Sequence, residues 1–110
     1  MENKVFSYMG FAAKARKLVT VYNTCIYMME KKKIRLLILT EDLAENSVKK
    51  MVSAAEKYRV PCKIYGNREQ LSTRTGNVDP GIYGITDDNF AKVISEGIER
   101  IQQSPVQSEK

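Results

Sequence analysis

Two pairs of neighbouring carboxylates are the residues in this sequence best suited to acid–base chemistry or to holding a metal ion. Glu41 and Asp42 follow one apolar run, and Asp87 and Asp88 follow another. Positions between a strand and a helix often carry active sites in α/β proteins, but carboxylates there also cap helices and neutralise their dipoles. A magnesium or phosphotransfer site would need a third carboxylate or a phosphate-binding loop, and the glycines form no such motif. Helix capping is therefore the expected role of both pairs.

The rest of the composition also argues against an enzyme. The sequence has no histidine, which is the commonest general base and transition-metal ligand. Its two cysteines, Cys25 and Cys62, are too few for a disulfide framework and lack a metal-ligand spacing. We expect two buried thiols, with no metal site and no cofactor.

Basic residues are concentrated in the first half of the chain. The 110-residue sequence has a net charge of +5, with 12 Lys/Arg and 6 Asp/Glu in residues 1–59, against 6 and 7 in residues 60–110. Such a basic half is typical of a nucleic-acid-binding protein, although solvated helix surfaces are also rich in lysine. The cations form three clusters: Lys14, Arg16 and Lys17; Lys31, Lys32, Lys33 and Arg35; Lys49 and Lys50.

A helix predicted to begin directly after Thr20 follows the first basic cluster. If the cluster lies beside the start of this helix, its charges add to the free N–H groups that favour phosphate there. Phosphate contacts position a nucleic acid without reading its sequence, so base contacts would come from the helix start itself. The candidates are Val21, Tyr22, Asn23 and Thr24. Local backbone hydrogen bonding is the alternative role for Asn23, and packing is the alternative for Tyr22 and Tyr27.

The elements that would position these residues alternate along the chain. Apolar periodicity predicts helices over residues 5–17, 21–29, 45–58, 67–76 and 88–101, and strands over 18–19, 34–39, 62–65 and 82–86. Thr20 is the expected cap of the second helix, Asn67 with Gln70 forms a capping box, and Asp87 or Thr86 caps the last helix. This order predicts an α/β fold, a three-layer α/β/α sandwich on a small, mostly four-stranded mixed sheet. We expect one domain over residues 1–101 and a disordered polar tail over 102–110.

No part of the sequence predicts a membrane partner. No apolar run approaches the ~20 residues that span a bilayer, and the N-terminal segment has neither a hydrophobic signal region nor a cleavage site. We therefore expect a cytoplasmic protein.

Four segments carry a family resemblance: KARKLV, LLILTED, VPCKIYGNREQLSTRTG and GITDDNFA. Over residues 5–101 the chain resembles the small ribosomal-protein superfamily that includes L7Ae and L30e, and it is most similar to the bacterial YlxQ-like branch. The resemblance implies an α/β/α sandwich that binds kink-turn RNA. Members use a glycine, an asparagine, a glutamate and a lysine at the start of the second helix, together with an apolar loop before the last strand.

This sequence departs from most of that motif. The four positions hold Val21, Asn23, Thr24 and Tyr27, so only the asparagine is retained, and Val78 is the large apolar residue of the loop. A valine side chain interferes with the close backbone approach that glycine permits. Threonine is shorter than glutamate and uncharged, whereas tyrosine replaces a phosphate ion pair with a ring that can stack on an unpaired base.

Two hypotheses follow. In the first, the chain is a non-enzymatic, ribosome-associated or structured-RNA-binding protein, with ribosomal RNA one candidate. Asn23 then contacts a base edge, and Lys14, Lys17, Lys31, Lys32 and Lys33 contact phosphates. In the second, the fold is kept but kink-turn binding is lost, and the second helix binds a protein partner or a second copy of the chain. Burial of both Tyr22 and Tyr27 within the monomer would exclude the second hypothesis.

Overall fold

The computed structural model describes residues 4–76 and 81–103, which form alternating helices and strands in the predicted order. The elements are α1 (Lys4–Lys14), β1 (Leu18–Val19), α2 (Tyr22–Glu30), β2 (Leu36–Leu39), α3 (Glu45–Tyr58), β3 (Cys62–Ile64), α4 (Arg68–Thr75), β4 (Ile82–Ile85) and α5 (Asp88–Gln103).

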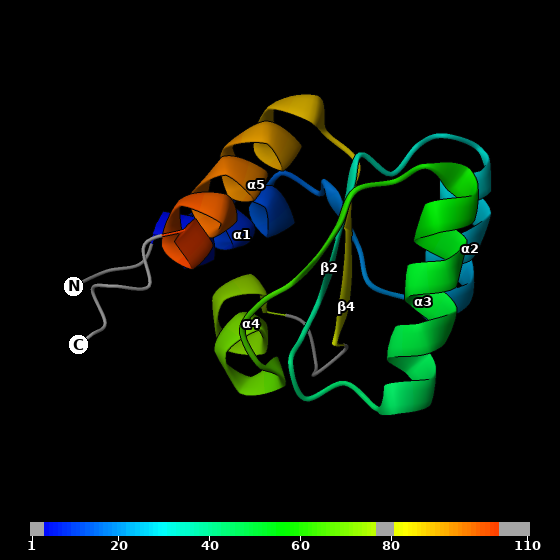
Figure 1. The fold of residues 1–110 in the computed structure, drawn as a ribbon. Coiled ribbons are helices and arrows are strands. Elements are labelled where there is room, and N and C mark those ends of the chain that lie inside the picture. The colour runs from blue at the N-terminus through cyan, green and yellow to red at the C-terminus, as the bar shows by residue number, and fades with distance from the viewer. Residues whose placement is uncertain (1–3, 77–80, 104–110) are drawn as a thin grey trace.

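A mixed four-stranded sheet separates two layers of helices (Figure 1). Its strand order is β1-β4-β2-β3; β2 and β3 are parallel, whereas β4 is antiparallel to both β1 and β2. Helices α1, α4 and α5 pack on one face, and α2 and α3 pack on the other. The predicted three-layer α/β/α sandwich is confirmed.

Strand β2 explains why both faces of the sheet are covered. All four of its side chains are buried, and none is polar. Leu36 and Ile38 face the core beneath α1, α4 and α5, whereas Leu37 and Leu39 face the core beneath α2 and α3. Because neither face can be left in water, a helical layer is needed on each side.

Local signals in the sequence set several helix ends. The predicted capping box at the start of α4 is present: the Asn67 side chain accepts from the Gln70 amide, and the Gln70 side chain accepts from the Asn67 amide. Gly76 ends this helix in a left-handed conformation. At α5, the Asp87 carboxylate accepts a hydrogen bond from the Phe90 amide at 2.9 Å, so Asp87 is the capping residue.

Other boundaries differ from the predictions. Thr20 does not cap α2; the capping position is Val21, which makes no side-chain cap hydrogen bond. Strand β2 begins at Leu36 rather than at residue 34, because Arg35 is exposed at the sheet end. Helix α5 continues to Gln103, beyond the predicted helix end at 101. The rest of the predicted tail, residues 104–110, lies outside the described residues.

Three helices end in the same way, each at a basic residue in the left-handed conformation. Arg16 follows α1, Lys32 follows α2 and Arg59 follows α3, with φ between 60° and 64°. In each turn the amide of that residue bonds to the carbonyl three residues earlier, and the next amide bonds to the carbonyl five residues earlier. This is the Schellman geometry, in which glycine is the usual residue.

Helix α2 lies unusually close to the sheet at Gly84. A methyl group on Gly84 would lie 2.8 Å from Ile34 Cδ1 and 3.2 Å from Cys25 Sγ, closer than van der Waals contact allows. The missing side chain in β4 therefore provides the space that the buried face of α2 occupies.

We expect Gly84→Ala to lower the free energy of unfolding by about 1–3 kcal/mol, because the added methyl overpacks the contacts with Ile34 and Cys25. Ile34→Val removes the atom that the methyl meets, so the cost of Gly84→Ala should be smaller in the Ile34→Val background. Urea unfolding of the four proteins measures this coupling. Equal costs in both backgrounds would contradict the proposed contact.

We expect Arg59→Gly to raise the free energy of unfolding by roughly 0.5–1 kcal/mol, because release of left-handed strain exceeds the added chain entropy. The matched control is Lys57→Gly within the last turn of α3, which should lower stability by about 1 kcal/mol. Thermal and urea unfolding measure both changes in stability. A lower stability of Arg59→Gly would contradict the claim that the left-handed conformation strains Arg59.

Candidate nucleic-acid interface

One face of α2 is anchored in the core and the opposite face is open. Cys25 and Met29 have no exposed surface, and together they hold the helix against the sheet. Asn23, Tyr27 and Lys31 are spaced four residues apart on the opposite face and are all exposed. Helical geometry thus places the one retained residue of the family motif, Asn23, in a row with Tyr27 and Lys31.

The two tyrosines of α2 have different surroundings. Tyr22 is partly buried and packs against the core beneath α2 and α3. Tyr27 is 58% exposed, and Val21 at the helix start is 60% exposed. The alternative packing role therefore fits Tyr22 but not Tyr27, and α2 keeps an apolar surface that a partner can contact.

The buried thiol of Cys25 fastens α2 to the edge strand. Its Sγ donates a hydrogen bond to the Val19 carbonyl at 3.2 Å. Burial raises the pKa of this thiol to about 11, although a backbone hydrogen bond at Gly84 acts in the opposite direction. The prediction of two buried thiols holds for Cys25 but not for Cys62, which is only partly buried, although burial raises its pKa as well.

The three consecutive lysines after α2 point in different directions. Lys32 Nζ donates to the Tyr58 carbonyl at 3.0 Å, which ties the end of α2 to the end of α3. Lys31 Nζ lies 5.5 Å from the centroid of the Tyr27 ring. Lys31 and Lys33 line an open pocket of about 410 Å³ together with Thr24, Tyr27 and Met28. The spacing of residues 24, 27, 28 and 31 is that of one helix face, a signal by which the sequence could have indicated Met28.

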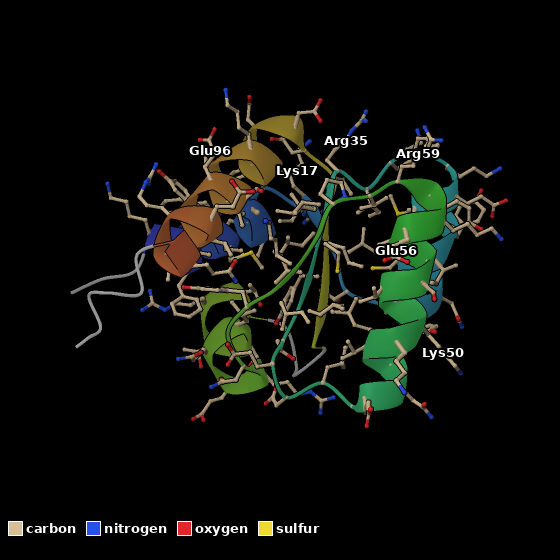
Figure 2. The ribbon with its side chains drawn as sticks, viewed as in Figure 1. Lys17, Arg35, Lys50, Glu56, Arg59 and Glu96 are labelled. Atoms are coloured by element: carbon tan, nitrogen blue, oxygen red, sulfur yellow. The ribbon has the colours of Figure 1, made fainter. Side chains whose placement is uncertain are left out.

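Lys14 and Lys17 do not lie beside the start of α2, which corrects the expected placement. The backbone carbonyl of Lys17 accepts a hydrogen bond from the Thr86 amide at the end of β4, and Leu18 of β1 pairs with Ile85 of β4. Val21 is four residues further along the extended chain, roughly 13 Å away. Figure 2 shows Lys17 with Arg35 and Arg59 at one end of the molecule.

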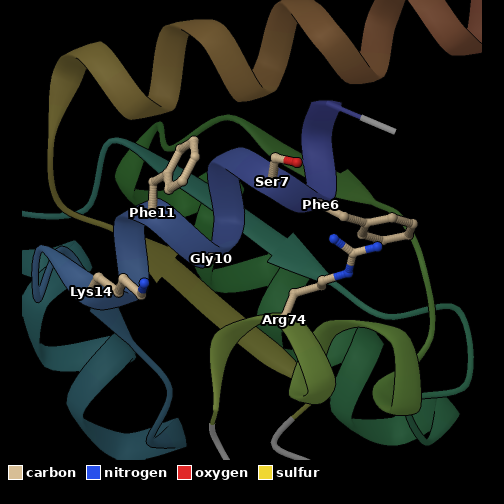
Figure 3. Close-up of a pocket in the computed structure, with 6 residues that line it drawn as sticks. All are labelled: Phe6, Ser7, Gly10, Phe11, Lys14 and Arg74. Atoms are coloured by element: carbon tan, nitrogen blue, oxygen red, sulfur yellow. The ribbon is translucent and has the colours of Figure 1, made fainter. Parts of the chain in front are cut away.

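Lys14 belongs to a different hollow, between α1 and α4 (Figure 3). Gly10 allows these helices to approach, since a methyl group there would lie 2.9 Å from the Arg74 carbonyl oxygen. The Arg74 guanidinium lies 6.0 Å from the centroid of the Phe6 ring. This pocket of about 210 Å³ is lined by α1 and α4, which pack on the face of the sheet opposite α2.

The two acidic pairs lie at opposite ends of the sheet, because β2 and β4 are antiparallel. Asp87 caps α5, and Asp88 forms an exposed ion pair with Arg35 at 3.2 Å. At the other end, Asp42 accepts from the Arg68 amide at 3.1 Å. Burial acts to raise the pKa of Asp42, but hydrogen bonds, including this one, outweigh it and lower the pKa. The Asp42 carboxylate thus serves the start of α4, whereas α3 begins after Ala44 without a side-chain cap.

The described residues contain no cluster of three or more His, Cys, Asp or Glu able to hold a metal ion. Within the same part of the chain, no helix is long and apolar enough to cross a membrane. Val78, the predicted apolar loop residue, lies outside the described residues.

We expect the buried Cys25 thiol to make stability depend on pH above neutrality. Its folded pKa of about 11 exceeds the ordinary value of 9.0, so its contribution is complete below pH 9 and is lost as the pH rises towards 11. Between pH 8 and 10.5 this loss amounts to about 2 kcal/mol. Urea unfolding at a series of pH values should show that the free energy of unfolding declines less with pH in Cys25→Ala than in the wild type. Equal declines in the two proteins would contradict the raised pKa of Cys25.

Comparison with known proteins places the chain in a family. The model of the ribosomal protein L7Ae/L30e/S12e/Gadd45 family matches residues 3–94. The RNA-binding protein YlxQ of Bacillus subtilis (strain 168) is 33% identical over 91 residues, covering 82% of this chain and 91% of that protein. YlxQ of Enterococcus faecium is 29% identical over 96 residues, covering 87% of this chain and 92% of that protein.

Solved structures share the fold. A Bacillus halodurans protein of unknown function superposes with a TM-score of 0.86 at 28% identity, covering 89% of this chain and 99% of its own. The Giardia lamblia 15.5kD RNA binding protein shares the fold with a TM-score of 0.74 at 16% identity, and the match covers 94% of this chain and 92% of that protein. The resemblance read from the sequence is confirmed: the chain belongs to the ribosomal protein L7Ae/L30e/S12e/Gadd45 family, and its relatives there include the bacterial YlxQ proteins.

Proposed function

We propose that this chain is a non-enzymatic protein that binds structured RNA through the outer face of α2. The observation that carries the proposal is the exposed row of Asn23, Tyr27 and Lys31, which starts where the sequence resemblance places the RNA-contacting residues of the family. Two relatives bear the name RNA-binding protein, which supports the same conclusion. Ribosomal RNA is the first candidate ligand, given the ribosomal members of the family.

Asn23 is the residue proposed to contact a base. An exposed asparagine amide offers a donor and an acceptor side by side, which suits the edge of a purine. Val21 stands at the family's glycine position with 60% of its surface exposed, so it keeps an RNA backbone further from the helix start. We therefore propose kink-turn-like RNA as the ligand class, bound with a contact pattern altered at Val21, Thr24 and Tyr27.

The proposed phosphate contacts divide between two places. Lys31 lies eight residues after Asn23, roughly 12 Å along the helix, within reach of the same RNA strand. Lys14 ends α1, which packs on the face of the sheet opposite α2, and Lys17 directly precedes the edge strand β1, so an RNA that also contacts them must extend beyond the α2 face. Lys32 already donates to the Tyr58 carbonyl and contributes least.

A protein-interaction module is the second candidate function. Exposure of Val21 and Tyr27 favours it, because two large apolar side chains on one helix can form a contact patch. The partly buried Tyr22 adds little to that patch.

We expect Asn23→Ala to weaken binding to a kink-turn RNA by roughly 5- to 150-fold, the range for loss of a good base contact. Asn46→Ala, an exposed asparagine on α3, is the matched control and should leave affinity unchanged. Fluorescence anisotropy measures both variants. Undiminished affinity in Asn23→Ala would refute the proposed contact.

The logarithm of wild-type affinity should fall with the logarithm of salt concentration with a slope of about −3 to −5, if four to six phosphates are neutralised. A flat salt response would refute the electrostatic part of the proposal. Self-association through α2 without RNA binding, seen by sedimentation, would favour the interaction module instead.

A further inference from the structure

The pocket beside the second half of α2 combines an aromatic ring, an apolar side chain and two cations. Thr24, Tyr27 and Met28 come from the helix, and Lys31 and Lys33 come from its terminal turn. Its volume of about 410 Å³ is within the range of small-ligand sites. Among the residues that the structure describes, no acidic side chain lines it.

Tyr27 provides a surface for stacking. Its side chain stands on the outer face of α2 and is 58% exposed, so part of the ring is open to solvent. Lys31 Nζ lies over one face of the ring, 5.5 Å from its centroid, so a base stacks on the opposite face while the cation interacts with the same ring. Met28 is partly buried and gives the pocket a polarisable apolar wall.

The turn after α2 directs Lys31 and Lys33 into this pocket and Lys32 away from it. The left-handed conformation of Lys32 reverses the chain, and its Nζ bonds to the Tyr58 carbonyl. The amides of the three lysines bond to the carbonyls of Tyr27, Met29 and Met28. An anion at this helix end therefore meets ammonium groups, and the last carbonyls, which would repel it, already accept hydrogen bonds.

We infer that this pocket binds one unpaired nucleotide of an RNA, with its base on Tyr27 and Met28 and its phosphate between Lys31 and Lys33. A base within a duplex is stacked on both sides, so only an unpaired base can present a free face to Tyr27. Two cations and the absence of a lining carboxylate match a phosphodiester better than an apolar peptide. The inference rests on the proposed RNA binding and adds the second contact point on α2.

The probe is an RNA hairpin with a three-nucleotide uridine bulge, compared with the same hairpin without the bulge. We expect Tyr27→Ala to lower affinity for the bulged hairpin by roughly 5- to 150-fold, with a much smaller effect on the paired one. Tyr27→Phe keeps the ring and should bind as the wild type does. Tyr27 is exposed, so both variants should fold, which circular dichroism verifies.

The lysines provide a second, independent readout. Lys31→Gln and Lys33→Gln should each reduce the salt slope for the bulged hairpin by about 0.7–0.9, the value for one phosphate. Lys32→Gln is the matched control and should change it least. With 5-iodouridine in the bulge, photocrosslinking should place the adduct on Tyr27.

The outcomes separate this inference from the proposed function. If Asn23→Ala weakens RNA binding but Tyr27→Ala and both lysine variants do not, the pocket assignment is wrong and the RNA-binding function stands. If the wild type binds neither hairpin nor the kink-turn RNA, both are wrong. Loss of self-association in Tyr27→Ala, without any effect on RNA, would make the pocket a protein interface and overturn the inference.

Discussion

The pairing of β2 with β4 in the middle of the sheet is the constraint on which the rest of the structure depends. Both strands are buried along their whole length, so each face of the sheet requires a layer of helices. On one face that layer includes α2, and Gly84 sets how closely it approaches through contacts with Ile34 and Cys25. Since α2 buries only Cys25 and Met29 completely, the same packing that holds the helix leaves its outer face available for binding.

The basic charge of the chain has two physical roles that composition does not distinguish. Arg16, Lys32 and Arg59 follow the ends of α1, α2 and α3, and Figure 2 shows Lys17, Arg35 and Arg59 at one end of the molecule. Cations at helix C-termini are favourable because they interact with the negative end of the helix dipole. Three of the twelve cations in residues 1–59 therefore suit helix ends, whereas Lys31 and Lys33, in the turn after α2, line a pocket.

Local sequence patterns predict the helices and strands well. The relative positions of the candidate functional residues depend instead on contacts between distant segments. The capping box at Asn67, the cap at Asp87 and the limits of α3 follow from short-range rules, and each is confirmed. The direction in which β2 and β4 pair has no local signature, yet it places the two acidic pairs at opposite ends of the sheet. The different directions of Lys31, Lys32 and Lys33 depend on one left-handed residue, which a run of identical side chains does not reveal.

The departures from the family motif are consistent with one another in physical terms. Valine at position 21 restricts close approach at the helix start, and Thr24 lacks the charge of the family's glutamate there. Tyr27 replaces an ion-pairing side chain with a ring, and the cations next to it are Lys31 and Lys33, in the following turn. In the proposed mode of RNA binding, these changes weaken contacts at the N-terminus of α2 and place a ring that can stack next to the cations of the following turn. Asn23 remains at the start of this row, so a ligand that uses both ends must extend roughly 12 Å along the helix. The proposed ligand, an RNA strand with one unpaired base, can span this length, whereas a ligand that contacts only the start of α2 does not reach Tyr27 and Lys31.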